Sequence, residues 1–257
     1  MTSFAALHVP GKPLLLPNVW EFGLAAALAE AGCPAVGTTS LGVSAAHGFA
    51  DGAPGSRAAT VSLARALAPL DVLVSVDLAD GFSADPAAVA DLVVELAAAG
   101  VVGVNLEDGR ADGTLAPVAV QCRLISAVRA AAPAVFLNAR TDTHWLGTGP
   151  LAATLTRLRA YADAGADGVF VPGLADPSET AESVAAVDVP LNVLFLPGRT
   201  TLAGLASLGV ARVSLGSTPY RVALAAALAT VAAARDGEPL PLTPPSYADV
   251  AGLLPHQ

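Results

Sequence analysis

The chain has 257 residues, of which 54% are hydrophobic and 14% charged, and its formal net charge at pH 7 is −9. This composition excludes a disordered chain, and the negative charge argues against a nucleic-acid partner, which requires a basic surface. Lys12 is the only lysine among the 13 basic residues, and it precedes the first expected strand. Reactions that need an active-site lysine, such as Schiff-base chemistry and P-loop nucleotide hydrolysis, are therefore excluded.

The cysteines and the N-terminal residues indicate the cellular compartment. Cys33 and Cys122 lie 89 positions apart without a CxxC pattern, so we expect reduced cysteines in a cytoplasmic protein. The first residues, MTSFAALHVPGKP, do not combine a charged segment with an apolar one, and we expect no signal peptide. The longest uncharged apolar run, 222–234, is shorter than the ~17 residues that span a bilayer, so we expect no membrane partner.

Short apolar runs alternate with alanine-rich helical stretches along the chain, and helices end in glycine before several of the runs. Apolar strands separated by helices predict a parallel sheet covered by helices. Eight such units predict an α/β fold of the (β/α)8 TIM-barrel type rather than an open Rossmann sheet, since no GxGxxG motif follows the first strand. The expected strands are Leu14–Pro17, Ala35–Thr38, Leu73–Asp77, Val102–Leu106, Val135–Ala139, Gly168–Val171, Leu191–Phe195 and Arg212–Leu215.

The last long helical stretch, from about Thr218 to Arg235, is apolar on every side. A helix without a polar face must be buried all round, so we expect it to pack against another subunit of a homodimer or homotetramer. Residues 236–257 carry five of the twenty prolines and predict an extended arm with one short turn of helix. No linker divides the chain, and we expect a single barrel domain over residues 1–257 that ends in this arm.

Polar residues follow the expected strands, at the barrel end where active sites of this fold lie. Asp77 and Glu107 end neighbouring strands, and carboxylates without a nearby His or Cys suit Mg2+ or Mn2+ rather than zinc. Alternatively, they are solvated loop acids or form salt bridges at the rim. Arg140 ends the fifth strand and is suited to grip a substrate carboxylate, or else it pairs with Asp142 or Glu107. Trp20, which follows the first strand, and Asn192, at the start of the seventh, are further candidates for substrate binding.

Seven segments stand out in chain order: LPNVWEFGLAAALAEAGCPAVGTTSLGVSAAHGFADG, SVDLADGFS, VNLEDG, FLNARTDTHW, GADGVFVPG, PLNVL and GVARVSLGSTPYR. Together they resemble the isocitrate lyase/phosphoenolpyruvate mutase superfamily, above all its short phosphoenolpyruvate-mutase-like members. The resemblance extends over residues ~14–235, so it takes in all the expected strands.

The resemblance implies a Mg2+-dependent barrel enzyme. Such an enzyme makes or breaks a C–C or P–C bond next to the α-carbon of an α-oxo acid, through a pyruvate-type enolate. Asp77 and Glu107 match the metal-site acids, and Asp51 matches an acid that reaches the metal through water. The family's second acid is replaced by Ala79, and Asp80, one position further on, is the remaining candidate ligand.

The resemblance also implies how substrate is held. Thr39, Ser40 and Leu41 match the segment that binds the substrate carboxylate and oxyanion, and Arg140 matches the arginine that grips it. In this family the eighth helix is exchanged between subunits, in agreement with the apolar stretch described above.

The loop after the fourth strand, DGRADGTLAP, departs from the family pattern. It lacks the Lys, Cys and His of the isocitrate and methylisocitrate lyase lid, including the cysteine that would protonate the enolate. We therefore expect neither of those two activities. Arg110 is the only basic residue of this loop, and Gly173 stands where those lyases have a glutamate. His47 and His144 are candidate proton donors, unless they are loop-packing residues.

Three functions remain open from the sequence. The leading one is a Mg2+-dependent lyase that cleaves or forms a C–C bond of a small oxo- or hydroxy-dicarboxylate. The second is an enzyme that rearranges or cleaves the P–C bond of a phosphonate. The third is a barrel that binds an oxo acid without turning it over.

Overall fold

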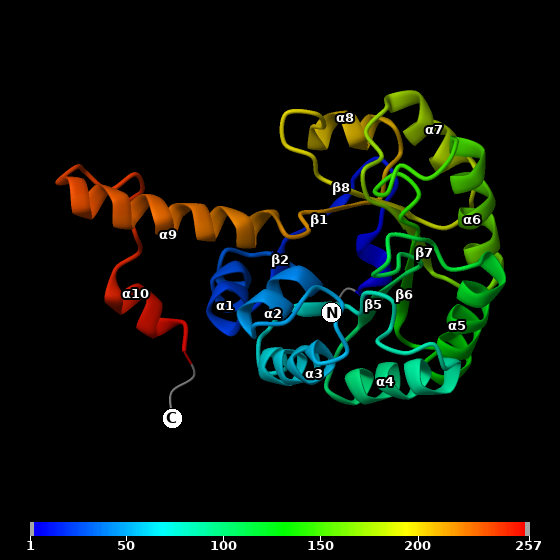
Figure 1. Cartoon of the computed structure of the whole chain (residues 1–257), viewed down its shortest axis with the longest axis horizontal. Helices are drawn as coiled ribbons and strands as arrows, with labels where there is room; N and C mark the ends of the chain where they lie inside the picture. Colours follow the sequence, from blue (N-terminus) through cyan, green and yellow to red (C-terminus); the bar gives the residue numbers. More distant parts are fainter. Residues whose placement is uncertain (1–2, 255–257) are drawn as a thin grey trace.

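The computed structural model describes residues 3–254. Nine strands form one sheet in the order β1-β9-β8-β7-β6-β5-β4-β3-β2, and all neighbouring strands are parallel (Figure 1). Outside the first strand, every predicted boundary lies within one residue of the observed one. The strands are β1 (Leu14–Leu16), β2 (Asn18–Val19), β3 (Ala35–Thr38), β4 (Leu73–Asp77), β5 (Gly103–Glu107), β6 (Phe136–Arg140), β7 (Gly168–Val171), β8 (Leu191–Leu194) and β9 (Arg212–Ser214).

The expected first strand is split at Pro17 into β1 and β2, and these two pieces pair with opposite edges of the sheet. β1 pairs with β9, whereas β2 pairs with β3, so a single interrupted strand closes the barrel. Pro17 has no N–H to donate, which interrupts the ladder there. Asn18 bridges the seam, because its Oδ1 accepts from the N–H groups of Leu215 and Gly216 (3.0 and 2.8 Å) and its Nδ2 donates to the Thr38 carbonyl (2.7 Å). The predicted (β/α)8 barrel is confirmed.

Helices follow the strands, and Figure 1 shows α3 to α7 succeeding one another around the outside of the barrel. Asp85 and Asp176 cap α4 and α7 by accepting first-turn N–H groups, and a proline follows each of them. No helix within residues 3–254 is long and apolar enough to cross a bilayer. The helices are η1 (Ala5–Leu7), α1 (Phe22–Glu30), α2 (Ser40–Ala46), α3 (Ser56–Leu67), α4 (Pro86–Ala98), α5 (Val118–Ala131), α6 (Leu151–Asp163), α7 (Pro177–Ala185), α8 (Leu202–Ser207), α9 (Thr218–Asp236) and α10 (Tyr247–Gly252).

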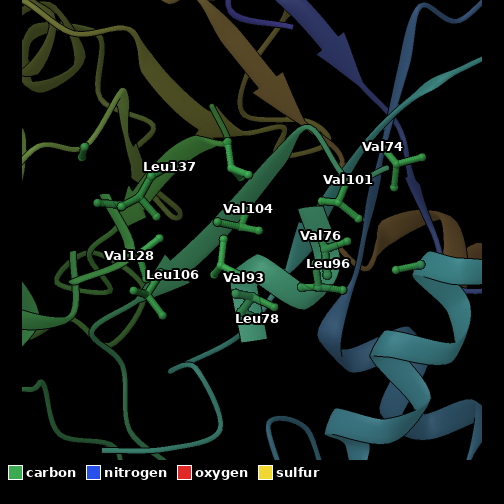
Figure 2. Packing of buried hydrophobic residues seen from close by; sticks show 14 of the residues in the cluster. Val74, Val76, Leu78, Val93, Leu96, Val101, Val104, Leu106, Val128 and Leu137 are labelled. Atoms are coloured by element: carbon green, nitrogen blue, oxygen red, sulfur yellow. The ribbon is translucent and has the colours of Figure 1, made fainter. Parts of the chain in front are cut away.

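Alternating strand residues belong to two different environments. Val104 and Leu106 of β5 join Val93 and Leu96 of α4 in the buried cluster between sheet and helices (Figure 2). The residues between them on β5 face the barrel interior, because successive side chains of a strand point to opposite faces. The outer face of each strand therefore builds the core, and the inner face is available for the site.

The N-terminal end of the barrel interior is closed by an apolar plug. Phe4, Leu14, Leu16, Ala35 and Phe136 form a separate buried cluster there. The His8 ring stacks on Phe136, with ring centroids 4.3 Å apart. Gly103 of β5 makes room for this plug, because a Cβ at this position would lie 2.7 Å from Phe4 Cε1.

Helix α9 points away from its own barrel (Figure 1). None of its residues is buried, and Val222, Leu224, Leu228 and Val231 are 57, 50, 73 and 68% exposed. The expected helix is thus present, and its burial against a second subunit stays a prediction. The arm contains one short helix, α10, as expected, and its last residues, 255–257, lie outside the described part of the chain.

Candidate active site

A pocket opens at the C-terminal ends of the strands and gathers most of the predicted site residues. Its wall includes six of them, Thr39, Ser40, Leu41, Asp51, Asp77 and Arg140. An adjoining pocket shares Asp51 and Arg140 and adds Asp80, Glu107 and Asp142. Residues from the ends of several strands therefore meet at one place, as the barrel fold predicts.

Asp77, at the end of β4, is 9% exposed and has one unused oxygen. Its Oδ2 accepts a hydrogen bond from the Ser40 N–H at 3.1 Å, and its own N–H donates to Thr38 Oγ1 at 2.9 Å. Its Oδ1 is buried and has no hydrogen-bond partner among residues 3–254. A buried carboxylate oxygen without a partner is unfavourable, so this atom is suited to bind a ligand or a cation.

Arg140, at the end of β6, makes both of the pairings that the sequence left open as alternatives to a substrate clamp. Its Nε and Nη2 donate to Asp142 Oδ1 and Oδ2 at 2.6 and 3.0 Å. Its Nη1 lies 2.6 Å from Glu107 Oε2, and both side chains of this pair are largely buried. The guanidinium is therefore engaged on all three nitrogens.

The cluster around Arg140 holds more acid than base. Burial raises the pKa of Glu107 well above its usual value; Arg140 opposes this shift, whereas Asp142, Asp77 and Asp51 add to it. Burial likewise raises the pKa of Asp142, against the effect of Arg140. Burial lowers the pKa of Arg140, but the charges of Glu107 and Asp142 outweigh burial, and the pKa is raised above its usual value. Four carboxylates thus surround one guanidinium, and a divalent cation would relieve their mutual repulsion.

The carboxylates of the site suit a magnesium ion that keeps several water ligands, rather than a metal ion held by protein ligands alone. No three His, Cys, Asp or Glu side chains of residues 3–254 are grouped closely enough to hold a metal by themselves. Mg2+ usually takes one or two carboxylates and keeps several waters. Asp77 Oδ1 meets that requirement, with Asp51 and Glu107 near enough to share the charge.

Asp80 belongs to a tight turn at the edge of the site. The preceding Ala79 has φ +49°, a left-handed conformation that is uncommon for residues other than glycine. Asp80 is exposed, and its Oδ1 accepts a hydrogen bond from the Phe82 N–H at 3.1 Å. Its carboxylate lines the adjoining pocket, and its role as a metal ligand stays a prediction.

Four predicted residues, Trp20, Asn192, His47 and His144, lie outside the walls of both pockets. Trp20 packs edge-to-face on Tyr220 of α9, with ring centroids 5.1 Å apart. Asn192 is buried in the barrel interior and donates to Ser214 Oγ at 3.0 Å. His47 is exposed, and its Nδ1 lies 2.9 Å from the Val43 carbonyl oxygen.

His144 is held by α6 and α7 rather than by the site. Its Nε2 lies 3.1 Å from Glu179 Oε2, and its Nδ1 lies 3.2 Å from Thr154 Oγ1. Both ring nitrogens are thus engaged, as the loop-packing alternative expected.

The short loop after β5 is anchored at its base by a buried acid. Asp108 Oδ1 accepts from the Asp142 N–H at 2.9 Å, and Oδ2 accepts from the Tyr161 hydroxyl and Arg157 Nη1 at 2.6 and 2.9 Å. Arg110, within the loop, lines the adjoining pocket. The base of the loop and the Asp142 carboxylate that binds Arg140 are thereby fixed to the same framework.

Several pocket residues were not predicted as part of the site, among them Trp145, Phe170 and Asn105. Trp145 and Phe170 form apolar walls, and the Phe170 ring centroid lies 5.6 Å from the Arg140 guanidinium carbon. Asn105 lies two positions before Glu107 on the same strand and also lines the pocket. The period of two along β5 was a signal that could have identified Asn105. Trp145 comes from a loop whose path the sequence does not define.

Comparison with known proteins identifies the family of this chain. Residues 4–235 match the family model described as phosphoenolpyruvate phosphomutase. An uncharacterized protein of Mycobacterium tuberculosis is 45% identical over 253 residues, covering 98% of this chain and 96% of the relative. The 2-methylisocitrate lyase of Bacillus subtilis is 32% identical over 190 residues, covering 69% and 61% of the two chains.

Solved structures share the whole barrel. A candidate phosphonomutase of Burkholderia cenocepacia has a TM-score of 0.84 at 40% identity and covers 91% of this chain and 96% of its own. A phosphonopyruvate hydrolase in complex with oxalate and Mg2+ has a TM-score of 0.82 at 23% identity, covering 95% and 90%, a likeness that shows the fold alone. This chain belongs to the phosphoenolpyruvate phosphomutase family, within the phosphoenolpyruvate mutase/isocitrate lyase superfamily of enzymes that act on oxo acids.

Proposed function

We propose that this protein is a Mg2+-dependent lyase that cleaves or forms a C–C bond next to the α-carbon of a small α-oxo or hydroxy acid. The reaction passes through a pyruvate-type enolate. The observation that carries the proposal is the buried Asp77 carboxylate, whose Oδ1 has no hydrogen-bond partner within residues 3–254 and whose side chain lies in the same pocket as Arg140. An anionic substrate and a cation can therefore meet between these two side chains.

Asp77 would hold the metal directly, with Glu107 and Asp51 sharing its charge and Asp80 as an outer ligand. Bound there, Mg2+ would supply electrostatic stabilisation of the negative charge that develops on the enolate oxygen. Asp77 keeps its orientation because its Oδ2 is fixed by the Ser40 N–H. The raised pKa of Glu107 supports the same assignment, since its buried charge lacks full compensation by Arg140.

Arg140 would bind the substrate carboxylate by exchanging a partner. Its Nε and Nη2 are held by Asp142 in a paired geometry, whereas Nη1 forms an ion pair with Glu107, whose Oε2 makes no hydrogen bond to the described residues. We infer that the substrate carboxylate displaces Glu107 from Nη1, while Asp142 keeps the guanidinium oriented. Thr39, Ser40 and Leu41 line the same pocket, but the Thr39 and Ser40 N–H groups already donate to the Val19 carbonyl and Asp77. The two hydroxyls and the Leu41 N–H would therefore be the donors to the remaining carboxylate oxygens. Trp145 and Phe170 would keep water from the enolate.

A phosphonate substrate is the second candidate. It is favoured by the 40% identity to the Burkholderia cenocepacia protein described as a candidate phosphonomutase. In that case the bond that rearranges or breaks is P–C, and the same pocket holds the same pyruvate-type enolate. The third candidate, a barrel that binds an oxo acid without turnover, rests on Ala79 in place of the second acid and on the short loop after β5.

Product analysis separates the three candidates. The protein with Mg2+ is incubated with a panel of hydroxy- and oxo-dicarboxylates, and release of pyruvate or another oxo acid is followed by a coupled dehydrogenase assay. The proposal predicts C–C cleavage of at least one of them, but no cleavage of isocitrate or methylisocitrate at ~1 per second or faster. Conversion of phosphonopyruvate in phosphorus NMR, without C–C cleavage, would establish the second candidate. Binding of oxalate without any turnover would establish the third.

We also propose that the enzyme works as a homo-oligomer in which α9 packs on a second copy of the chain. Val222, Leu224, Leu228 and Val231 together expose an apolar surface that a lone subunit leaves in water. The proposal predicts a species at least twice the 25.4 kDa chain mass in light scattering. Leu228→Asp should shift it toward the monomer, whereas Val94→Asp, on the exposed side of α4, should not. A monomeric wild-type protein at micromolar concentration contradicts the proposal.

A further inference from the structure

An arginine lies inside the barrel, beneath the pocket. Arg212 on β9 is 1% exposed, and its Nε donates to Ser214 Oγ at 3.3 Å. Its Nη2 donates to Asn105 Oδ1 at 3.3 Å, and its Nη1 has no partner among the described residues. Barrel interiors are normally filled by branched apolar side chains, and burying a guanidinium without a carboxylate contact is unfavourable for folding. Folding alone does not explain this placement.

The contacts of Arg212 fix the orientation of Asn105. A guanidinium has donors only, so the Asn105 atom that faces it must be the carbonyl oxygen. Asn138 Nδ2 donates to the same Oδ1 at 2.9 Å, so this contact is compatible with that orientation. With Oδ1 held by two donors, the Asn105 amide nitrogen is turned away from both.

The freed amide group belongs to the pocket. Asn105 pairs in register with Asp77 on the neighbouring strand and lines the pocket together with Asp77 and Arg140. Its Nδ2 makes no hydrogen bond to any of residues 3–254, although Asn105 is only 6% exposed. An unused N–H donor therefore lines the same pocket as the two side chains to which the proposed function assigns cation and carboxylate binding.

We propose that Asn105 is a further substrate-contacting residue, whose Nδ2 donates a hydrogen bond to a carboxylate or carbonyl oxygen of the bound oxo acid, and that Arg212 is the residue that positions it. The inference rests on the proposed function, because it needs an oxo acid in this pocket. It adds a donor on β5 to those of Arg140 and the Thr39–Leu41 segment.

The charge of Arg212 reinforces this role. Burial lowers the pKa of Arg212 to about 9, with Asp77 opposing the shift, so the side chain stays protonated at neutral pH. The positive charge polarises the Asn105 amide through its carbonyl oxygen, which strengthens the N–H as a donor. The same charge acts on His8, where burial and Arg212 together lower the pKa to about 4.

Calorimetry with oxalate tests the Asn105 contact. Mn2+ is first titrated alone, and oxalate is then titrated at saturating Mn2+ into the wild type and Asn105→Ala. We expect Asn105→Ala to weaken oxalate binding about 10-fold or more, since a hydrogen bond to a charged acceptor is lost, and to change Mn2+ affinity less than about threefold. Ser75→Ala is the matched control, because Ser75 is a buried polar residue of β4 that does not line the pocket.

Two outcomes of this experiment are distinguishable failures. Equal oxalate affinity of wild type and Asn105→Ala overturns the Asn105 assignment alone. No oxalate binding by the wild type with Mn2+ overturns the proposed function and this inference with it. Asn105→Asp provides a second variant, because its carboxylate can pair with Arg212 and keep the fold while it removes the donor and repels the anion.

A double-mutant cycle tests the positioning role of Arg212. Arg212→Met should weaken oxalate binding in the same direction, and the double variant with Asn105→Ala should bind no more weakly than Asn105→Ala alone. In Arg212→Met, NMR titration should also show a raised pKa for His8. A lower melting temperature with unchanged oxalate affinity would assign Arg212 a structural role only. If Arg212→Met does not fold, Asn138→Ala removes the other donor to Oδ1 and should give a smaller loss of oxalate affinity.

Discussion

The two ends of the barrel interior differ in chemistry although the same strands build both. On β6, Phe136 belongs to the apolar plug at the N-terminal end, Asn138 lies in the buried polar layer above it, and Arg140 reaches the pocket. Each step along the strand is two residues. The position of an inward-facing residue along its strand therefore decides whether it stabilises the fold or lines the ligand pocket.

This difference has separable consequences. The plug is closed by aromatic packing, so changes there should alter the free energy of unfolding and leave ligand binding intact. The pocket end holds paired and unpaired charges, so changes there should alter binding and leave stability largely intact. Variants at either end test whether stability and binding are separable in this way.

Phe4→Ala should have the largest effect on stability. Phe4 is 4% exposed and packs edge-to-face on Phe136 with ring centroids 5.6 Å apart. Its removal leaves a cavity and should cost about 3 kcal/mol or more in urea unfolding. Leu202→Ala, at a site 40% exposed, is the control and should cost less than about 1 kcal/mol. Weakened Mn2+ or oxalate binding by folded Phe4→Ala would contradict the separation of the two ends.

Acid should destabilise the plug through His8. The pKa of His8 is lowered from 6.5 to about 4 by burial and by the charge of Arg212, so between these pH values the unfolded chain binds a proton that the folded chain does not. Stability is therefore complete above pH 6.5 and is lost as the pH falls toward 4, by about 3 kcal/mol in total.

Urea unfolding of wild type and His8→Phe over this pH range measures the effect. The difference between the two proteins isolates His8, because the buried Glu107 and Asp142, whose raised pKa values act in the opposite direction, contribute equally to both. Parallel curves for the two proteins would show that His8 is protonated in the folded state.

Arg140→Lys should have a smaller effect, confined to binding. An ammonium retains the charge but cannot hold Asp142 through two nitrogens and also contact Glu107. We expect oxalate affinity at saturating Mn2+ to fall about 10-fold, with Mn2+ affinity alone nearly unchanged. Arg110→Lys, in the loop after β5, is the matched control. Unchanged oxalate affinity in Arg140→Lys would remove Arg140 from the substrate site.

Much of this fold could be predicted from the sequence, because local patterns define its elements. The strand that ends in Asp77 and the helix begun by Asp85 and proline carry their signals within a few residues. The barrel then dictates that strand ends converge, which identified Asp77, Glu107 and Arg140 as neighbours before any geometry was known. The break at Pro17 was missed because its signal, a single proline, resembles an ordinary strand end.

Contacts between distant parts of the chain could not be predicted in this way. Arg212 and Asn105 are 107 positions apart, and only the closed barrel brings them together. The sequence indicated three possible partners for Arg140, a substrate carboxylate, Asp142 or Glu107, and only the structure shows which of these side chains it contacts. Trp20 follows the first strand but packs on Tyr220 of α9, a contact between residues 200 positions apart.

Calorimetric Mn2+ titration of Asp77→Asn tests the central claim most directly. The substitution keeps the shape of the side chain and one acceptor oxygen but removes the charge. Asp91→Asn, on the exposed surface of α4, is the matched control. We predict that Asp77→Asn binds Mn2+ about 100-fold more weakly than wild type, with its melting temperature retained, and that Asp91→Asn binds normally. Equal Mn2+ affinity of wild type and Asp77→Asn would contradict the assignment of Asp77 as the metal anchor, and with it the proposed mechanism.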